Sequence, residues 1–417
     1  MKGFIKYIGK IKSFSYAFGF QVSERIFYFI FFLVLARTFS VAEYGEIVLI
    51  FTVHNILLAV FNFGLPVLIQ KSISSDRNGA GRQIIYFLFL NLLISVLYLS
   101  SSAILYLSFF GNINTVLYAA ISLSICVSSF FNLNVSANYG LLRLKHQFYL
   151  VSAIRTVTIA VIIFLVFCQI KEVSLFIALL GISNLISWTL LLKDIRNEFP
   201  KGGGETLQRK ELKAILKATY PLALISVINF LYTKIDVVLI SYFLTLEDIS
   251  YYNVGYGVFT AAQLFFGFIL TGGFSEVSSY NRNMKAVKLF LIKYVKLITA
   301  ISLSLAVILF IAGSVIINSV WGIRYSGSGE VLSLLAFALI PLSINNLTGI
   351  ILNGLDMFKQ NLAAISLGLA VNIILNIFLI NSIGIKGAVI ATIITEIVIL
   401  TADLYFLIPF IFKKEVR

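Results

Sequence analysis

Charged side chains are rare in the long apolar stretches of this chain, and the few that occur there are the residues able to do chemistry. Lys234 and Asp236 lie near the middle of "YTKIDVVLISYF" (232–243), inside an apolar run that extends from Ala218 to Leu244. A charge at the centre of a membrane-spanning helix costs about 2.5–3.5 kcal/mol on insertion scales, and such charges usually face a bundle interior or a wet cavity. We therefore treat both residues as candidates for a functional site.

Two other apolar stretches carry charges of this kind. Glu24 and Arg25 lie in the first stretch, and Glu396 and Asp403 lie in the last. An arginine binds phosphate through a planar fork of donors, whereas a lysine acts as a point charge. Arg25 and Lys234 are therefore candidates for binding an anionic diphosphate or an acidic sugar.

The residues around Asp236 form a polar stripe. Asn229, Tyr232, Thr233 and Asp236 recur at i, i+3, i+4 and i+7, and this spacing places them on one face of a helix. Lys234 points about 160° away from Asp236, at about 100° per residue. We expect the stripe, including Asn229, to face a substrate cavity.

The acids beside these cations have two interpretations. In the functional one, Asp236 and Glu24 offset Arg25 and Lys234 and release them between conformations. In the structural one, fixed ion pairs tie the first span to the seventh and take no part in transport.

The last apolar stretch has a polar face of its own. Thr392, Glu396, Ile399 and Asp403 are spaced at i, i+4, i+7 and i+11. A carboxyl group withdrawn from water there could carry a coupling H⁺ or Na⁺. The alternative, which we favour, is that Glu396 and Asp403 hydrogen bond to a neighbouring helix.

Other chemical groups give weaker signals. Cys126 and Cys168 lie in apolar runs and His54 and His146 are far apart, so we expect no disulfide framework, no metal site and no organic cofactor. The tyrosines at 251, 252 and 256 fit an aromatic belt at the membrane surface better than a sugar-stacking platform.

The elements that position these residues follow from composition. The chain is 59% hydrophobic and 12% charged, whereas soluble proteins average about 25% charged residues. A helix needs about 20 apolar residues to cross a bilayer. That length predicts an all-α integral membrane protein with twelve transmembrane helices, at 14–36, 46–69, 84–110, 114–138, 149–170, 173–192, 218–244, 250–275, 290–320, 331–353, 361–381 and 386–411.

The basic residues predict the orientation of these helices. If the N-terminus is inside, 26 of the 32 Lys and Arg residues fall at inside segments, four fall at outside loops, and Arg25 and Lys234 lie within spans. We count Arg143, Lys145 and Arg155 together at one inside loop. Because cytoplasmic loops carry an excess of Lys and Arg, this pattern predicts N-in and C-in. It also explains the net charge of +14 without nucleic acid as a partner.

The densest charge run divides the spans into two halves. We expect an N-terminal six-helix lobe at 1–192, a cytoplasmic linker at 193–217 and a C-terminal six-helix lobe at 218–417. Similar stretches open the two halves, "FLVLARTFSVAEYGEIVLIF" (32–51) and "VVLISYFLTLEDISYYNVGYGVF" (237–259). In both, a short turn with Ser or Thr precedes an acid and a Tyr. Repeats of this kind are frequent in transporters, whose substrate site lies between the halves near the midplane.

Three blocks of sequence resemble a known family. "LARTFSVAEYGEIVLI" with "FNFGLPVLIQK" (61–71) resembles the start of polysaccharide-unit transporters. "YPLALISVINFLYTKIDVVLISYFLTLEDISYYNVGYGVF" (220–259) is similar to their seventh and eighth helices, and "ILNGLDMFKQNLAAISLGLAVNIILNIFLINSIGIKGAVIATIITE" (351–396) to their tenth to twelfth. The family is the Wzx-type lipid-linked oligosaccharide flippases, in the superfamily that includes multidrug and toxin extrusion transporters.

The resemblance implies a multi-pass protein of the bacterial inner (plasma) membrane that is not an enzyme. Its substrate would be an undecaprenyl-diphosphate-linked oligosaccharide repeat unit, moved to the outer leaflet by alternating access for O-antigen, capsule or a related polymer. The implied partners are this lipid, the bilayer, and the polymerase and chain-length proteins of the same pathway.

Two alternatives remain. A cation-coupled multidrug-type exporter has the same fold but should offer an acidic cavity, whereas here cations accompany the acids. A membrane enzyme acting on lipid-linked sugars should carry a large outside loop or a catalytic His/Asp cluster, and the expected outside loops are short and lack His.

Overall fold

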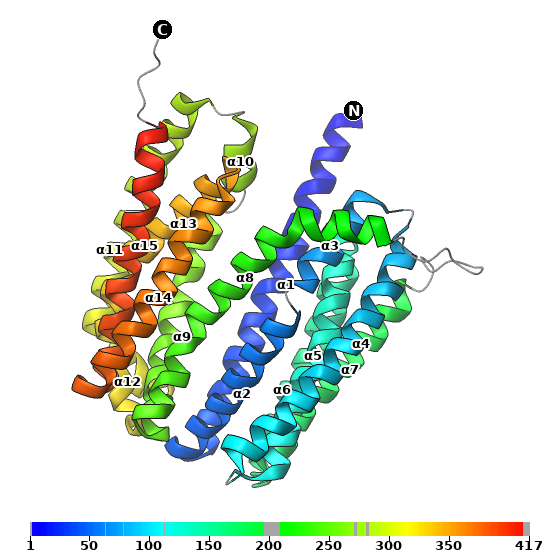
Figure 1. Cartoon of the computed structure of the whole chain (residues 1–417). Coiled ribbons are helices and arrows are strands. Elements are labelled where there is room, and N and C mark those ends of the chain that lie inside the picture. Colours follow the sequence, from blue (N-terminus) through cyan, green and yellow to red (C-terminus); the bar gives the residue numbers. More distant parts are fainter. Residues whose placement is uncertain are drawn as a thin grey trace. The chain divides into compact units, whose positions relative to one another are not determined.

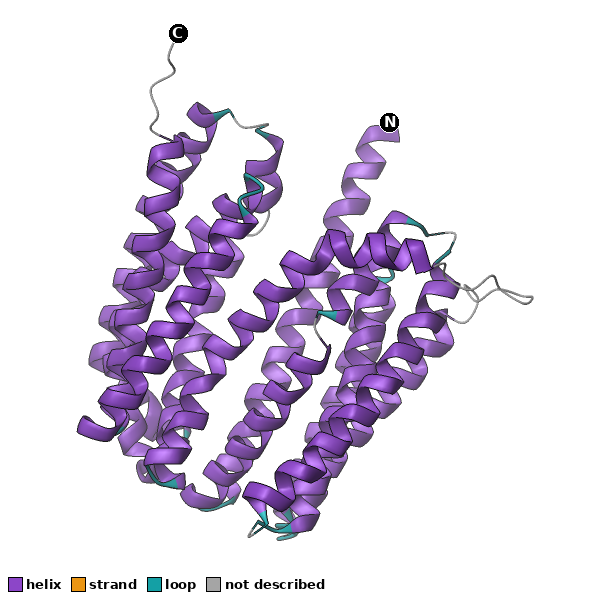
Figure 2. Cartoon of the chain, in the orientation of Figure 1, coloured by secondary structure: helices purple, strands orange, loops and turns teal. Residues whose placement is uncertain are grey.

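The computed structural model describes residues 2–62, 64–77, 79–111, 113–195, 209–270, 273–280 and 283–411, and in these residues the regular structure is helical without a strand (Figures 1 and 2). The expected all-α membrane fold is therefore confirmed. The middle of the predicted linker, 196–208, lies outside the described residues. The helices are α1 (Lys2–Thr38), α2 (Val41–Asn62), α3 (Leu65–Ser75), α4 (Ala80–Leu105), α5 (Thr115–Leu141), α6 (Leu144–Phe167), α7 (Val173–Ile195), α8 (Arg209–Phe243), α9 (Leu246–Ile269), α10 (Gly273–Ser279), α11 (Met284–Val320), α12 (Ser326–Leu335), α13 (Leu339–Gly354), α14 (Phe358–Ile383) and α15 (Ile385–Ile411).

Eleven segments of the described chain are helical, long and apolar enough to cross a bilayer. They match eleven of the expected spans. The remaining one corresponds to α9, whose 24 residues include Tyr, Asn and Gln side chains that lower its hydropathy. The count of twelve and the N-in, C-in orientation stay predictions.

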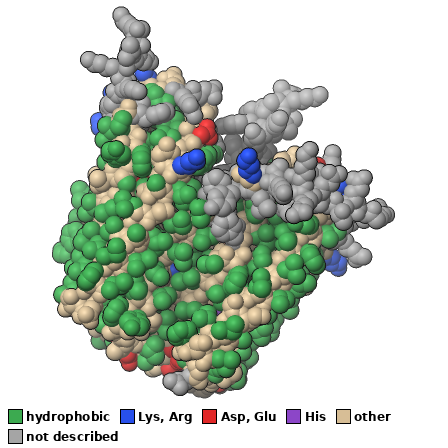
Figure 3. Space-filling view, viewed as in Figure 1, with side chains coloured by type: hydrophobic (Ala, Val, Ile, Leu, Met, Phe, Trp, Pro, Cys, Tyr) green, Lys and Arg blue, Asp and Glu red, His purple; other side chains and the backbone are tan. Residues whose placement is uncertain are grey.

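Hydrophobic side chains cover much of the face of the described helices that Figure 3 shows. Leu107, Phe109 and Phe167 are 80%, 79% and 82% exposed. Soluble monomers rarely show large contiguous apolar patches. Lipid is therefore the solvent for this surface.

Two expected helix ends are wrong. The predicted span 46–69 contains a break, because α2 ends at Asn62 and Gly64 adopts the left-handed backbone conformation with φ 73°. Glycine enters this region at no steric cost, and Pro66 in the first turn of α3 suits a helix start. Figure 1 shows α2 and α3 as two separate helices. A similar difference occurs in the second half of the chain. The expected span 250–275 corresponds to α9, which ends early at Ile269, and the short helix α10 follows.

The chain packs as two compact units. Unit 1 contains residues 1–39 and 53–223, and unit 2 contains residues 40–52 and 224–417. α2 is therefore divided, because its first turns belong to unit 2 and its last turns to unit 1. The predicted lobes at 1–192 and 218–417 stay predictions.

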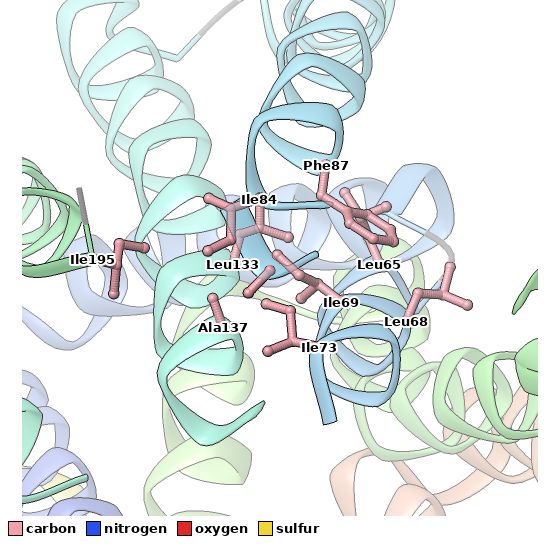
Figure 4. Packing of buried hydrophobic residues seen from close by; sticks show 10 residues of the cluster. Leu65, Leu68, Ile69, Ile73, Ile84, Phe87, Leu133, Ala137 and Ile195 are labelled. Atoms are coloured by element: carbon pink, nitrogen blue, oxygen red, sulfur yellow. The ribbon is translucent and has the colours of Figure 1, made fainter. Parts of the chain in front are cut away.

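Unit 1 has a core built by short and long helices together (Figure 4). Leu65, Ile69 and Ile73 of α3 pack against Phe87 of α4 and Leu133 of α5. Ile69 and Ile73 have no exposed surface. The four-residue spacing of these side chains gives α3 one apolar face, and that face anchors α3 to the longer helices.

The repeated sequence at 40–44 and 245–251 forms repeated structure. Ser40 Oγ accepts from the backbone N–H of Glu43 at 3.2 Å, and Glu43 Oε2 accepts from the N–H of Ser40 at 2.8 Å. At the start of α9, Thr245 and Asp248 exchange the same pair of bonds, at 3.3 and 3.2 Å. Both are capping boxes, which satisfy the free N–H groups of a helix start.

The capped starts of α2 and α9 contact each other within unit 2. Ser250 Oγ donates to the carbonyl oxygen of Val41 at 2.5 Å, and the Tyr44 hydroxyl donates to Asn253 Oδ1 at 3.2 Å. Gly45 faces the carbonyl oxygen of Leu246 so closely that a Cβ at this position would collide with it. The missing side chain permits the contact.

Candidate functional site

Asp236 on α8 is 3% exposed and accepts hydrogen bonds from three other helices of unit 2. Asp236 Oδ1 accepts from Asn376 Nδ2 of α14 at 2.8 Å. Asp236 Oδ2 accepts from the Tyr252 hydroxyl of α9 at 2.5 Å and from Thr392 Oγ1 of α15 at 3.3 Å. All three donors are neutral. Within the described chain, no ion pair joins Asp236 to Lys234, and none joins Asp236 to the first span.

Tyr252 differs from its expected place in an aromatic belt. It is 1% exposed and acts as a donor to Asp236. Its ring stacks on that of Tyr256, with 5.6 Å between the ring centroids. The belt prediction is wrong for Tyr252, because its hydroxyl satisfies a buried carboxylate.

Glu396 on α15 joins α8 and α13. The Tyr232 hydroxyl donates to Glu396 Oε1 at 2.7 Å, and Asn345 Nδ2 donates to Glu396 Oε2 at 2.7 Å. Glu396 is 3% exposed. These bonds to neighbouring helices are the arrangement that we favoured from the sequence.

Asp403 lies further along α15 and is 1% exposed. Thr348 Oγ1 of α13 donates to Asp403 Oδ2 at 2.5 Å. Asp403 Oδ1 and Asn345 Oδ1 are buried and accept no hydrogen bond from the described residues. Buried oxygens are normally hydrogen-bonded, so the Asp403 carboxyl group is suited to carry a proton, and either oxygen could be a ligand for a small hard cation.

Asp236, Glu396 and Asp403 are all buried in unit 2, and we refer to these three residues as the carboxylate cluster. Their side-chain partners are amides and hydroxyls rather than Lys or Arg. Among the described residues no group of three or more His, Cys, Asp or Glu side chains is placed to hold a metal ion. The cluster can therefore exchange protons or bind a monovalent cation through oxygen atoms, and it lacks the ligand set of a transition-metal centre.

The stripe predicted on α8 is only half buried. Tyr232 and Asp236 point into the polar contacts just described, whereas Asn229 is exposed and Thr233 Oγ1 donates to the carbonyl of Phe230 in its own helix. Lys234 is half-buried and forms no ion pair with a described residue. The helical spacing placed these side chains on one face correctly, but packing differs along that face.

In unit 1, Glu24 and Arg25 have different environments although they are neighbours on α1. Arg25 is exposed and forms no ion pair with a described residue. Glu24 is bound by Arg155 of α6, whose Nε and Nη2 donate to its two oxygens at 2.7 and 3.1 Å. Glu24 is therefore not a partner of Arg25, and it ties α1 to α6 instead of to the seventh span.

Arg155 is a buried charged residue that the sequence analysis wrongly assigned to a loop. It belongs to the interior of α6 rather than to an inside loop, and it is 2% exposed. Its remaining donors bond to Ser183 Oγ and Asn184 Oδ1 of α7, both at 2.8 Å. Its guanidinium lies 4.6 Å from the ring centroid of Phe27 and 5.0 Å from that of Phe131. The signal was available, because residue 155 falls inside the expected span 149–170.

A second polar centre of unit 1 surrounds His54 on α2, which is 1% exposed. Its Nε2 lies 3.1 Å from Ser102 Oγ of α4, and this hydroxyl lies 2.9 Å from Ser122 Oγ of α5. The ring packs edge-on against Tyr118, at 4.6 Å between centroids. Sequence spacing did not indicate this network, because its members come from three separate helices.

Comparison with protein families gives one match. A family described as "Polysaccharide biosynthesis protein" matches residues 34–329. These residues cover most of the described helices, including α8 and α9 with Asp236 and Tyr252, but not α14 or α15. Among curated proteins, none matches the chain by sequence.

Solved structures share the fold. A multidrug resistance MATE family transporter of the MOP superfamily, in an inward-facing conformation, aligns with TM-score 0.74 and 13% identity over 94% of this chain and 96% of its own. The lipid II flippase MurJ, in an inward closed conformation, aligns with TM-score 0.73 and 16% identity over 96% and 89%. A MOP superfamily transporter from Pyrococcus furiosus, described as having a binding pocket of reversed polarity, aligns with TM-score 0.67 and 13% identity over 95% of both chains. At these identities the likeness is one of fold.

Proposed function

The chain belongs to the polysaccharide biosynthesis protein family, and from this premise we propose that it is a flippase for a lipid-linked oligosaccharide. It moves an undecaprenyl-diphosphate-linked repeat unit from the cytoplasmic to the outer leaflet of a bacterial inner membrane. The unit serves O-antigen, capsule or a related surface polymer. The shared fold with transporters and a flippase supports transport rather than enzymatic chemistry.

The observation that carries this proposal is the state of Lys234. It is half-buried in a membrane-spanning segment, and none of the described carboxylates pairs with it. A cation in such a place is costly unless an anion compensates it. A substrate that brings a diphosphate or an acidic sugar supplies that anion, whereas a cationic drug would be repelled. Lys234 therefore favours the flippase over a multidrug-type exporter.

Arg25 plays the corresponding part in unit 1. Its neighbour Glu24 is held by Arg155, so the Arg25 guanidinium keeps its donors for another acceptor. A guanidinium forks onto a diphosphate with two parallel hydrogen bonds. Arg25 thus binds substrate. Glu24 acts as a structural partner of Arg155, and we do not propose it as a substrate contact.

The carboxylate cluster is the coupling site of this proposal. Glu396, Asp403 and Asp236 are buried among neutral donors, and the unpartnered carboxyl oxygen of Asp403 suits H⁺ or Na⁺. Binding of a cation supplies a change of charge in unit 2. The hydrogen bonds from Tyr252, Asn376 and Thr348 rearrange in response to this change of charge. Asn229, which is exposed, remains a candidate contact for the sugar.

The direct test is deletion of the gene in its native strain. We expect surface polymer to disappear and the lipid-linked repeat unit to accumulate on the cytoplasmic face, as measured by lipid extraction and by protection from externally added glycosidase. The wild-type gene should restore display, and Lys234→Gln should not, at equal abundance in the membrane. Unchanged lipid-linked sugars together with increased drug sensitivity would favour the exporter instead.

Lys234→Arg is the matched control, because it keeps the charge. If the role of Lys234 is to attract an anion, Lys234→Arg should retain much of the display that Lys234→Gln loses. Equal activity of both variants and the wild type would remove Lys234 from the site. The proposed partners, the polymerase and chain-length proteins of the pathway, can be sought independently among the genes whose loss gives the same surface phenotype.

A further inference from the structure

The first turns of α11 carry a cluster of lysines on one side of the helix. At about 100° per residue, four lysines and two apolar residues fall within a sector of about 140°. We call this sector the lysine face, and it consists of Lys285, Lys288, Leu289, Ile292, Lys293 and Lys296. Lys288 is half-buried, and the other members are exposed.

The opposite side of the same turns is packed within unit 2. Val287 and Phe290 are 0% and 3% exposed. The Phe290 ring centroid lies 6.4 Å from that of Tyr280 and 4.5 Å from that of Tyr294. Because the helix is held on this side, the backbone positions of the lysine face are set before any ligand binds.

The length of α11 places the lysine face at the surface of the bilayer. Residues 297–320 carry no charge, and at about 1.5 Å per residue they extend about 36 Å, which is enough to cross a hydrocarbon core of about 30 Å. Residues 284–296 extend about 20 Å further. Lys293 and Lys296 therefore lie at the headgroup level, with Lys285 and Lys288 above it. This depth holds for either orientation of the chain in the membrane.

Positive charge is in excess at this end of unit 2. Within α11, all of which the structure describes, the sequence contains no Asp or Glu. The adjacent segments contribute Glu276 of α10, which accepts from the Tyr280 hydroxyl at 2.7 Å, and Asp356, which follows α13. α10 and α13 meet where Ser278 Oγ donates to the carbonyl oxygen of Gly354 at 3.3 Å. These two acids do not balance the four lysines.

The pattern of the lysine face indicates what binds there. Leu289 and Ile292 are 69% and 41% exposed between the lysines, and this mixture is typical of helices that lie among lipid headgroups. The lysines are spread over about 16 Å of helix, which suits several separate phosphate groups better than a single diphosphate. A group of four or more basic residues beside a membrane span is typical of anionic-lipid binding. A soluble acidic partner would complement the lysines but leave both apolar side chains uncovered.

We propose that the lysine face of α11 binds the headgroups of anionic phospholipids. The lysines contact the phosphates, and Leu289 and Ile292 lie against the upper parts of the acyl chains. This site is separate from the substrate contacts proposed for Arg25 and Lys234. It does not depend on which molecule the protein transports.

The test places a fluorescent reporter in the lysine face of the purified full-length protein. The two native tryptophans are removed by Trp188→Phe and Trp321→Phe, and Leu289→Trp is added. Quenching by phosphatidylglycerol or phosphatidylcholine with brominated acyl chains then gives the relative affinity of the two lipids at this position. We expect phosphatidylglycerol to be favoured about tenfold.

The matched control reporter is Ile311→Trp in the same background. Ile311 is 73% exposed and lies in the uncharged part of α11. It should therefore show no preference between the two lipids. Equal quenching by both lipids at Leu289→Trp would overturn the proposal.

Removal of charge tests the lysines themselves. Lys→Gln at positions 285, 288, 293 and 296 together should abolish the preference measured at Leu289→Trp, whereas Lys→Arg at the same positions should keep it. A control with the same change of net charge replaces exposed lysines on four other segments, namely Lys145→Gln, Lys171→Gln, Lys359→Gln and Lys386→Gln. This control should leave the preference unchanged. An equal loss in both sets would mean that net charge decides binding, and the proposal would fail.

A second measurement avoids the reporter and keeps the proposal testable if the tryptophan variants do not fold. Protein with native tryptophans is repurified from an equimolar mixture of the two lipids, and the retained lipid is counted by mass spectrometry. The wild type should retain severalfold more phosphatidylglycerol than the glutamine variant of the four lysines, and equal retention would overturn the proposal. Displacement of phosphatidylglycerol by a polyglutamate peptide at the same concentration would make an acidic protein segment the partner and would overturn it as well.

Discussion

Arg155 and Arg25 have opposite surroundings within unit 1, and this difference has consequences for mutation. Arg155 is 2% exposed and bonds to Glu24, Ser183 and Asn184, whereas Arg25 is exposed. The Arg155 guanidinium is buried and uses four of its five N–H donors on these three side chains, so it is committed to the fold. Arg155, which the sequence analysis placed in a loop, thus stabilises unit 1. Arg25, the neighbour of Glu24, is the arginine that remains a candidate for substrate binding.

We expect Arg155→Met to destabilise the protein, because it leaves the Glu24 carboxylate, whose side chain is only 15% exposed, without its cation. Breaking a buried ion pair by removing one partner costs about 3–5 kcal/mol. Abundance in the membrane and thermal unfolding in detergent measure the effect. The double variant Arg155→Met with Glu24→Gln should recover part of the lost stability.

Arg25→Ala is the matched variant on the same helix. It should keep near wild-type abundance and melting temperature, because Arg25 is exposed and forms no ion pair with a described residue. It should abolish surface polymer, because the proposed function requires this guanidinium to bind substrate. Polymer display by Arg25→Ala cells would remove this residue from the site, and loss of the protein itself would show that Arg25 is structural.

Asp236→Asn separates charge from shape in the carboxylate cluster. The amide keeps one oxygen for Asn376 or Tyr252, and the hydroxyls of Tyr252 and Thr392 can accept from its NH₂ group. We therefore expect the variant to insert and unfold nearly as the wild type does but to lose most transport. Asp236→Leu removes the acceptor of the buried Tyr252 hydroxyl, at about 1–3 kcal/mol, whereas Thr392 and Asn376 keep acceptors at Ala388 and Asn372, and the variant should be less stable.

A fixed ion pair between Asp236 and Lys234 would give a different result, namely rescue of one variant by the other. If Asp236→Asn is unstable and Lys234→Gln restores both stability and polymer display in the double variant, the two side chains act as an ion pair. The observed donors to Asp236 are neutral, so we expect no such rescue.

At the scale of elements, the contact between the starts of α2 and α9 depends on a glycine. A methyl group at Gly45 would collide with the carbonyl oxygen of Leu246, a backbone atom that cannot rotate away. Overpacking of this kind costs about 1–3 kcal/mol. Gly45→Ala should lower the melting temperature in detergent and reduce polymer display.

Gly257 in α9 is the control for this prediction, because a Cβ there meets no other atom within 4 Å. Replacing a glycine by alanine inside a helix stabilises it by roughly 1 kcal/mol when space allows. Gly257→Ala should therefore melt at or above the wild-type temperature. Equal effects of the two substitutions would mean that helix propensity, and not the contact with Leu246, decides the outcome.

At the scale of the whole molecule, the distribution of basic residues makes a prediction about topology. Assigning Arg155 to the interior of α6 removes one residue from the inside count but leaves the large excess of Lys and Arg on that side. Reporter fusions after Gly111, Lys171 and Leu246 should report an outside location, and fusions after Gly79, Gly203 and Lys285 an inside one. Reproducible inversion of either set would contradict the N-in, twelve-span arrangement.

The sequence by itself determined the features that depend on neighbouring residues. The length of apolar runs predicted where the membrane helices lie, since about 20 residues are needed to cross the hydrocarbon core. Paired Ser/Thr and acidic residues at 40–43 and 245–248 marked two helix starts, because a capping box closes within one turn. Gly64 and Pro66 also indicate the helix break after Asn62, but a span prediction based only on the length of apolar runs did not detect it.

Only the tertiary structure decided which charges are paired. Glu24 meets Arg155 across 131 residues of sequence, and Asp236 meets Asn376 across 140. Periodicity gives the face of a helix on which a side chain lies, but not the helix that packs against that face. Each buried polar group takes its donors from whichever helices the packing brings near, and this choice separated Arg25 from Glu24 and Asp236 from Lys234.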